Sequence, residues 1–193
     1  TPSPALGVTT VGVGNCGFSI APCPPECRDL IARNLAEVEG MSLTALRSGT
    51  NWEFESFDEY LGLLRQKGVT PNVAAFIGHS AVRTMVMGEE ASERAANDDE
   101  VAAMRDLVVG GMDAGAIGFS TSTSINHHGD GGVPMPSRLA EESELRSLVS
   151  VLGEKGRGVF QLTVGPSMTS EVMESIAADN GCPVFQTAAL HNA

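Results

Sequence analysis

The chain has few basic residues, few cysteines and no long apolar run, and each scarcity excludes a class of protein. Lysine and arginine number 12 against 24 aspartates and glutamates, and the net charge is −12. This charge argues against nucleic acid and anionic membrane surfaces as partners. No apolar run reaches the about 18 residues that cross a bilayer, and no basic segment precedes a signal-like stretch. We therefore expect a protein that contacts neither nucleic acid nor membrane.

The 4 cysteines among 193 residues are too few for a disulfide framework. Cys23 and Cys27 are one residue further apart than the pair of a zinc knuckle, and no second pair completes a set of ligands. A proline-stiffened turn before a helix is the interpretation that we favour for them. Cysteines that stay reduced are typical of the cytoplasm, which is the compartment we expect.

The segment GVTTVGVGNCGFSIAP, residues 7–22, is the most informative in the chain. Its β-branched run predicts a buried strand over residues 8–13, and the glycines around Cys16 predict a sharp turn at the end of that strand. Parallel α/β proteins carry their chemistry at the carboxyl ends of strands. Cys16 is therefore a candidate site residue. The other interpretation is a small buried residue that fills a tight turn.

Predicted strands and helices alternate along the rest of the chain, which is typical of βαβ units and a parallel sheet. The strands are expected at 72–78, 116–119, 158–164 and 183–190, and the helices at 26–38, 56–66, 98–114, 141–155 and 167–180, with a looser polar segment at 40–51. Such units are too few here for a closed eight-stranded barrel of about 250 residues. From the pattern alone, part of a barrel and an open doubly wound sheet are both compatible with the sequence.

Polar residues follow two of these strands. His79 follows the second predicted strand, and Ser120, Thr121 and Ser122 follow the third. Hydroxyls and amides at strand ends can hold a substrate, although ordinary turn chemistry also places them there. We therefore predict that these four residues line a pocket at the same edge of the sheet as Cys16.

Two other polar groups are weaker candidates. His127, His128 and Asp130 resemble a metal cluster by composition, but adjacent histidines do not easily face one ion, and an exposed loop is the interpretation that we favour. Arg83 could bind a carboxylate through both nitrogens of its guanidinium, although a solvated charge on a helix is the simpler expectation.

Segment 7–22 resembles the corresponding segment of the N-acyl-D-amino-acid deacylases (D-aminoacylases), a branch of the metal-dependent amidohydrolases. Three further blocks agree in the same order, NVAAFIGHSAVR at 72–83, GAIGFSTS at 115–122 and PSRLA at 136–140. The resemblance implies a (β/α)8 TIM-type barrel. This chain would supply about five βα units of it, as one partial domain over residues 1–193 cut from a longer amidohydrolase. It also implies zinc as cofactor, Cys16 as a zinc ligand, and hydrolysis of the linear amide bond of an N-acyl-D-amino acid or a related amide.

The sequence departs from the family at two strand ends. The family's strand that matches 159–163 ends in a zinc-binding histidine, where this chain has Thr163. The next strand carries a second histidine ligand, where this chain has Ala188, and His191 is not an evident substitute. The family's His-x-His pair and its catalytic aspartate have no counterpart within these residues. We therefore expect the chain to be inactive by itself.

Two further interpretations remain open. The chain could be a diverged, non-catalytic barrel that acts as a binding or assembly module, as the missing histidines suggest. It could also be a small-molecule binding protein with an open sheet, although GVGNCG does not match the GxGxxG pattern of dinucleotide sites. An incomplete barrel exposes sheet edges and part of its inner face, so we also expect self-association.

Overall fold

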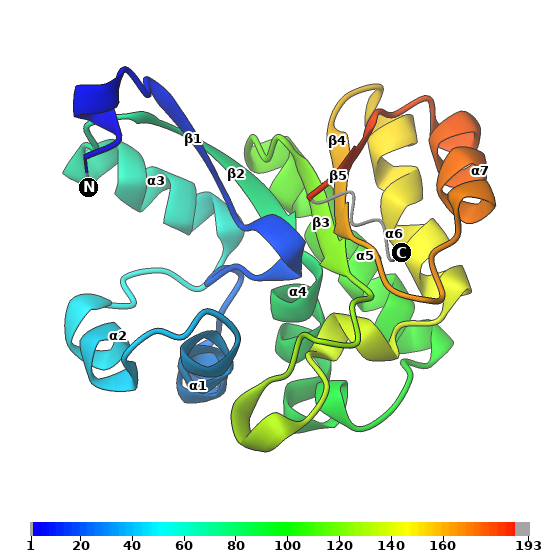
Figure 1. Ribbon diagram of the computed structural model, residues 1–193, viewed down its shortest axis with the longest axis horizontal. Helices are drawn as coiled ribbons and strands as arrows, with labels where there is room; N and C mark the ends of the chain where they lie inside the picture. Colours follow the sequence, from blue (N-terminus) through cyan, green and yellow to red (C-terminus); the bar gives the residue numbers. More distant parts are fainter. Residues whose placement is uncertain (1, 188–193) are drawn as a thin grey trace, which may run out of the picture.

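The computed structural model describes residues 2–187, and within them 5 parallel strands form one curved sheet (Figure 1). The strands are β1 (Thr10–Val13), β2 (Asn72–Gly78), β3 (Gly118–Ser122), β4 (Val159–Thr163) and β5 (Val184–Gln186). Their order across the sheet equals their order in the chain. A doubly wound sheet reverses its strand order, whereas a barrel does not. The predicted partial TIM-type barrel is therefore confirmed, and the open doubly wound sheet is excluded.

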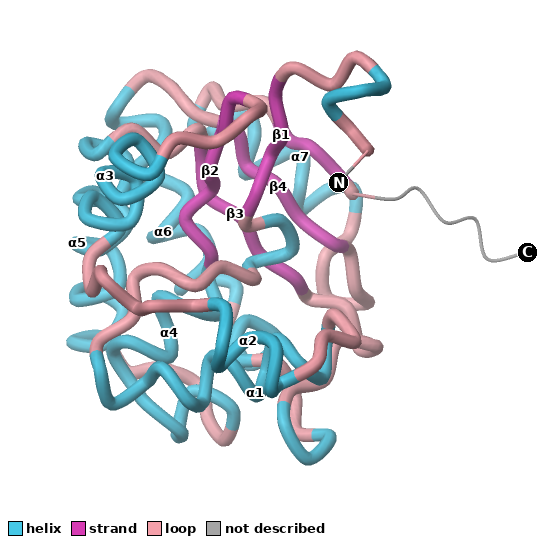
Figure 2. Tube along the Cα trace, turned by 90° about the vertical axis from the view of Figure 1, so that its left-hand side faces the viewer, coloured by secondary structure: helices cyan, strands magenta, loops and turns pink. Residues whose placement is uncertain are grey.

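Helices cover one face of this sheet. The described helices are α1 (Arg28–Val38), α2 (Leu43–Gly49), α3 (Phe57–Lys67), α4 (His79–Met87), α5 (Asp98–Ala114), α6 (Glu142–Lys155) and α7 (Ser170–Asn180). Helices α3, α5, α6 and α7 pack against one another in that order. Figure 2 shows α3, α5 and α6 together on one side of the strands, as in the outer ring of a barrel. Among residues 2–187, none of the helices combines the length and the apolar character that spanning a bilayer requires.

The hydrophobic core lies between the sheet and this layer of helices. Ile77 and Phe119 project from β2 and β3 and are fully buried, as are Met104 of α5 and Leu148 of α6. Helix α5 begins where predicted because Asn97 and the third residue of the first turn form a reciprocal capping box. Burial of the apolar stripes of α5 and α6 fixes these helices against the outer face of the sheet.

The structure differs from the sequence prediction in four places. Strand β1 covers Thr10–Val13 only, and its residues alternate between exposed and half-buried instead of forming a buried strand over residues 8–13. Segment 40–51, expected to be loose, contains the short helix α2, which Ser42 caps by accepting from the backbone of Ala45. Helix α4 begins directly at the end of β2, with no loop and no capping side chain. Strand β3 continues through Ser122, so the residues expected to follow it, Ser120, Thr121 and Ser122, lie within the strand and are buried. Part of the predicted strand at 183–190 lies outside the described residues.

Candidate active site

Cys16 lies in a tight turn, residues 14–17, which follows β1 and contacts β2, β3 and β4. Its backbone is left-handed (φ 59°), a conformation that a residue other than glycine adopts only when its surroundings hold it there. The Cys16 N–H donates to Oε1 of Gln161 at 2.7 Å. The Ser120 hydroxyl accepts from the Gly17 N–H at 3.1 Å and donates to the Gly14 carbonyl. Side chains of β3 and β4 therefore fix the geometry of this Cys16 turn.

Two threonine hydroxyls surround the thiol of Cys16. The Thr163 hydroxyl, at the end of β4, donates to Sγ at 3.0 Å. The Thr187 hydroxyl, just after β5, lies 3.9 Å from Sγ and 3.3 Å from the Thr163 hydroxyl, and it accepts from the Gln161 amide. The carboxyl ends of β1, β4 and β5 thus converge on one polar cluster, at the edge of the sheet where barrel enzymes place their sites.

Cys16 differs from the other cysteines in its accessibility. Cys23, Cys27 and Cys182 are buried, whereas Cys16 is partly exposed, and all four are free thiols. Burial raises the pKa of Cys23 to about 12 and raises the pKa of Cys27 and Cys182 as well. Because the thiolate is the form that binds metals, these buried thiols are poor ligands. Cys23 and Cys27 lie at the entry to α1 and form no zinc knuckle.

The described residues do not complete a zinc site at Cys16. A zinc centre takes three or four protein ligands, chiefly Cys, His, Asp or Glu. Within residues 2–187, no three such side chains are placed to share an ion. The predicted ligand position on β4 is occupied by Thr163, whose hydroxyl binds the thiol instead. The other predicted positions, Ala188 and His191, lie outside the described residues. Further ligands would have to come from beyond the part of the chain that the structure describes.

The polar side chains of β3 project alternately to the two faces of the sheet. Ser120 lies under the Cys16 turn, as described above, whereas Thr121 faces the helices and its hydroxyl is 2.8 Å from Nδ1 of His79. The other ring nitrogen of His79, Nε2, is 2.8 Å from Oε1 of Glu144 on α6. His79 is completely buried, and its protein partners occupy both nitrogens. The predicted pocket residues are therefore near neighbours of the Cys16 turn, but their side chains are engaged within the protein.

A buried ion pair lies behind His79, and the sequence interpretation missed it. Arg83, expected to be a solvated charge, is fully buried and binds both carboxylate oxygens of Glu144, at 2.7 and 2.5 Å. Its second terminal nitrogen donates to the backbone carbonyl of Arg94 at 2.8 Å. A signal was present, because Glu144 lies at helical spacing from Leu148 on the apolar face of α6. A carboxylate on a buried face requires a charged partner.

Three polar side chains of the loop of residues 123–135 each have a separate partner, and His127 is half-buried rather than exposed as expected. His127 binds the Ser122 hydroxyl through Nδ1 at 2.6 Å, and His128 binds the carbonyl of Asn126 at 3.1 Å. Asp130 forms an ion pair with Arg33 of α1. The three side chains thus have separate partners and do not face a common point.

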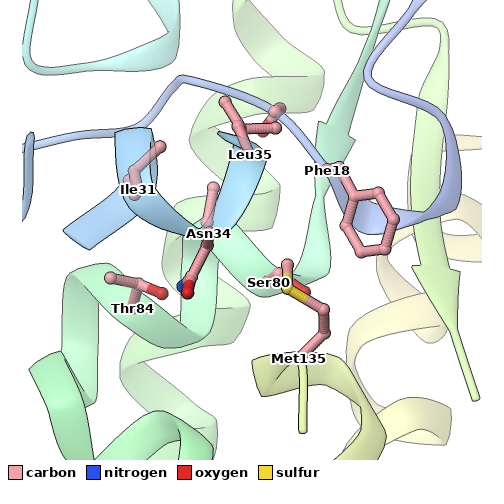
Figure 3. Close-up of a pocket in the computed structure, with 9 residues that line it drawn as sticks. Phe18, Ile31, Asn34, Leu35, Ser80, Thr84 and Met135 are labelled. Atoms are coloured by element: carbon pink, nitrogen blue, oxygen red, sulfur yellow. The ribbon is translucent and has the colours of Figure 1, made fainter. Parts of the chain in front are cut away.

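A small cavity between α1 and α4 lacks the volume of a substrate site. Figure 3 shows it between Phe18, Asn34 and Met135, and its volume is about 10 Å³. That volume accommodates roughly one water molecule.

No family model matches the chain. It is 42% identical over 125 residues to a D-aminoacylase of Alcaligenes xylosoxydans xylosoxydans, and this match covers 63% of the chain and 22% of the relative. A crystal structure of D-aminoacylase superposes with a TM-score of 0.67 at 30% identity, over 96% of this chain and 35% of that chain.

A second solved structure gives the same result. The N-acyl-D-glutamate deacylase of Bordetella bronchiseptica, solved with zinc and a phosphonate mimic of the tetrahedral intermediate, superposes with a TM-score of 0.66 at 26% identity. The match covers 94% of this chain and 34% of that one, so the chain spans about a third of the length of these structures. By sequence and by fold, the chain belongs to the D-aminoacylase branch of the amidohydrolases.

Proposed function

We propose that the protein carrying this chain is a metal-dependent amidohydrolase that cleaves the linear amide bond of an N-acylated amino acid, with Cys16 as one of its zinc ligands. The observation that carries the proposal is the Cys16 turn, which holds a partly exposed thiol at the carboxyl edge of the sheet. Support also comes from the similar proteins, which are named for deacylation of D-amino acids and one of which was solved with zinc.

In this proposal, the chain's own residues position one ligand rather than build the whole metal centre. Gln161 and Ser120 fix the backbone of the Cys16 turn, so the thiol is oriented before any ion binds. A role for His79, Ser120, Thr121 and Ser122 in binding substrate stays a prediction. Because their side chains are buried and hydrogen-bonded within the protein, they are better suited to holding the Cys16 turn in place than to contacting a substrate.

The test is substitution of Cys16 by serine in the intact protein that contains this chain. We expect near-stoichiometric zinc in the wild type. In Cys16→Ser we expect at least a tenfold loss of bound zinc and of activity toward N-acetyl-D-amino acids. The reason is that removing even a residue that only supports a metal ligand lowers metal affinity or activity by about 10- to 100-fold. Elemental analysis and amide hydrolysis assays measure the two effects. Cys182→Ser, a buried thiol in the segment before β5, is the matched control and should keep its zinc.

The second candidate function is a non-catalytic binding or assembly module. The observation that favours this function is the hydrogen bond from the Thr163 hydroxyl to the Cys16 thiol, at a position where a metal ligand was expected. This alternative predicts no zinc in the wild type and no amide hydrolysis. In that case Cys16→Ser would change only the free energy of unfolding, and the amidohydrolase proposal would be wrong. Zinc and activity that both survive in Cys16→Ser would instead show that Cys16 is not a ligand.

We also propose that the isolated chain self-associates in the cytoplasm. Strand β1, the first strand of the sheet, has one unpaired edge within the described residues, and Phe185 of β5 is 52% exposed. Unpaired edges and exposed apolar side chains promote pairing with other chains. Light scattering of the isolated chain should give a mass above that of one chain, 20.1 kDa, rising with concentration. A mass that stays at one chain over a hundredfold concentration range would contradict this expectation.

A further inference from the structure

His127 lies on the same face of the sheet as the Cys16 thiol, one strand away from it. Ser122 and Thr163 are paired in register on β3 and β4, so their side chains project to the same face. Thr163 reaches the Cys16 thiol on that face. His127 is bonded to the Ser122 hydroxyl at 2.6 Å. Its ring therefore lies beside the candidate site, although the residue belongs to a loop.

The ring of His127 is held in one orientation. Its edge packs against Phe18, two residues after Cys16, with ring centroids 5.0 Å apart and planes at 65°. The guanidinium of Arg138 donates to the backbone carbonyl of His127 at 2.9 Å. With the bond to Ser122, these contacts fix the ring and its backbone. A side chain so constrained is suited to binding a ligand, because little rotational freedom remains to be lost.

The loop that carries His127 is itself docked onto α1. Asp130 forms an ion pair with Arg33, and its backbone N–H donates to Oδ1 of Asn34 at 2.9 Å. Asn34 is 4% exposed and also borders the small cavity of Figure 3. A β-carbon at Gly129 would lie 2.5 Å from the same Asn34 oxygen, so only glycine permits this close docking. The loop is thus anchored to α1 at Gly129 and Asp130, close to His127.

The hydrogen bonds around Ser122 determine which nitrogen of His127 carries the proton. The buried Ser122 hydroxyl accepts from the Ser124 N–H at 3.2 Å. Among residues 2–187, the acceptor available for its own proton is Nδ1 of His127. A buried hydroxyl without an acceptor is costly, so Ser122 donates to Nδ1 and the ring proton resides on Nε2. Within the same described residues, Nε2 has no protein partner and is not buried. His127 therefore presents a free N–H donor.

The surroundings favour an anionic acceptor for this donor. Burial lowers the pKa of His127, and the nearby Arg138 and His128 lower it further, so the ring is neutral at pH 7. Arg138 also makes the neighbourhood locally positive in a chain whose net charge is −12. A carboxylate would accept from Nε2–H without repulsion from the local charge.

We propose that His127 is a substrate-binding residue of this site, donating from Nε2–H to the carboxylate of the N-acyl amino acid. The proposal rests on the proposed function and adds the residue that would recognise the free carboxylate of the substrate. Ser122 is the positioning residue, because it acts only through the orientation of the His127 ring.

Steady-state kinetics of the intact protein test this proposal. In His127→Ala we expect the KM for an N-acetyl-D-amino acid to rise about tenfold, the effect of losing one hydrogen bond to a charged group, with kcat changed less than about twofold. His127→Gln should restore most of the affinity, because its amide nitrogen reaches the position of Nε2. His127→Asn, whose amide reaches only the position of Nδ1, should not. His128→Ala, the exposed neighbour, is the matched control and should behave as the wild type.

Two results would overturn the proposal. One is a KM in His127→Ala equal to that of the wild type and of His128→Ala. The other is a ring proton on Nδ1, measured by ¹⁵N NMR of the histidine rings. A failure of the proposed function is recognised separately, as a wild type without zinc and without amide hydrolysis. NMR titration with N-acetyl-D-leucine then decides, because a shift of the His127 ring nitrogens supports carboxylate binding and unchanged nitrogens contradict it.

Discussion

Replacing Glu144 with glutamine should lower the free energy of unfolding by about 3–5 kcal/mol, the usual cost of leaving a buried charge without its partner. Glu144 is 2% exposed and Arg83 is fully buried, so water cannot replace the lost carboxylate. The same carboxylate also binds Nε2 of His79 at 2.8 Å, so one substitution weakens contacts between α4 and α6 at two points. Urea unfolding of the isolated chain, followed by circular dichroism, measures the change.

A surface ion pair on the same helix provides the control. Glu142, two residues earlier on α6, pairs with Arg146 and is exposed. Glu142→Gln should cost less than about 1 kcal/mol. The double variant Arg83→Met/Glu144→Gln should lose less than the sum of its single substitutions, because it removes both charges together. Equal losses in Glu142→Gln and Glu144→Gln would show that the buried pair contributes no more than a surface pair.

The same cluster predicts a loss of stability as pH falls. Burial raises the pKa of Glu144, but hydrogen bonds from His79 and Arg83 outweigh it and hold the pKa below its usual value. Burial also lowers the pKa of His79, against the pull of Glu144. Both groups therefore bind a proton more readily in the unfolded chain. Their stabilisation is complete above the pKa of an unfolded histidine, about 6.5, and declines as pH falls, first through His79 and then through Glu144. In Glu144→Gln the part of the decline that belongs to Glu144 should be lost, whereas the part that belongs to His79 should remain, because burial still lowers the pKa of His79.

Gly78→Ala should displace the Cys16 turn and lower kcat/KM of the intact protein by about 100-fold, the effect of a misplacement of about 1 Å in an active site. A β-carbon at Gly78 would lie 2.7 Å from the carbonyl oxygen of Gly17 and 2.7 Å from Oγ of Ser19. The φ of Gly78 is −92°, which any residue adopts, so the effect is purely steric. The Cys16 turn would have to move, because β2 is held by its neighbouring strands.

Gly12→Ala is the matched control for this substitution. Gly12 lies on β1 next to the same turn, and a β-carbon there would meet nothing within 4 Å. The rate at which a thiol reagent alkylates Cys16 provides a readout that does not depend on activity, because the other three cysteines are buried. We expect this rate to change in Gly78→Ala and to stay at the wild-type value in Gly12→Ala. If the two variants react alike, the turn is not in contact with Gly78 in solution.

Local sequence signals predicted the elements of the sheet and its helices well. Strand β2 was predicted with its observed bounds, because its apolar run ends at a glycine, and α5 was also predicted with its observed bounds, since Asn97 can cap its start. Helix α4 could not be found this way. It begins without a capping side chain, and buried residues lie on all of its faces, so no periodicity separates it from the preceding strand.

The candidate site was predicted only where its signal is local. Cys16 is recognisable because glycines surround it in a turn after a strand. The residues that hold it, Ser120 and Gln161, belong to strands far along the chain, and nothing in their own segments indicates this role. Ser122 was predicted to follow the third strand and to line a pocket, but register with β4 extends the strand through it. Pairing between strands that are distant in sequence is not encoded in any short window.

The dependence of the Cys16 turn on β3 and β4 has a consequence for the order of folding. The hydrogen bond between the Cys16 N–H and Gln161 joins residues 145 positions apart, and the bond between Gly17 and Ser120 spans 103. Contacts of such separation form late, because the intervening chain must first be brought together. During synthesis, β1 and its cysteine therefore emerge long before the strands that shape the turn. The thiol therefore acquires its final geometry only when β4 joins the sheet, and its reactivity would report on that step of assembly.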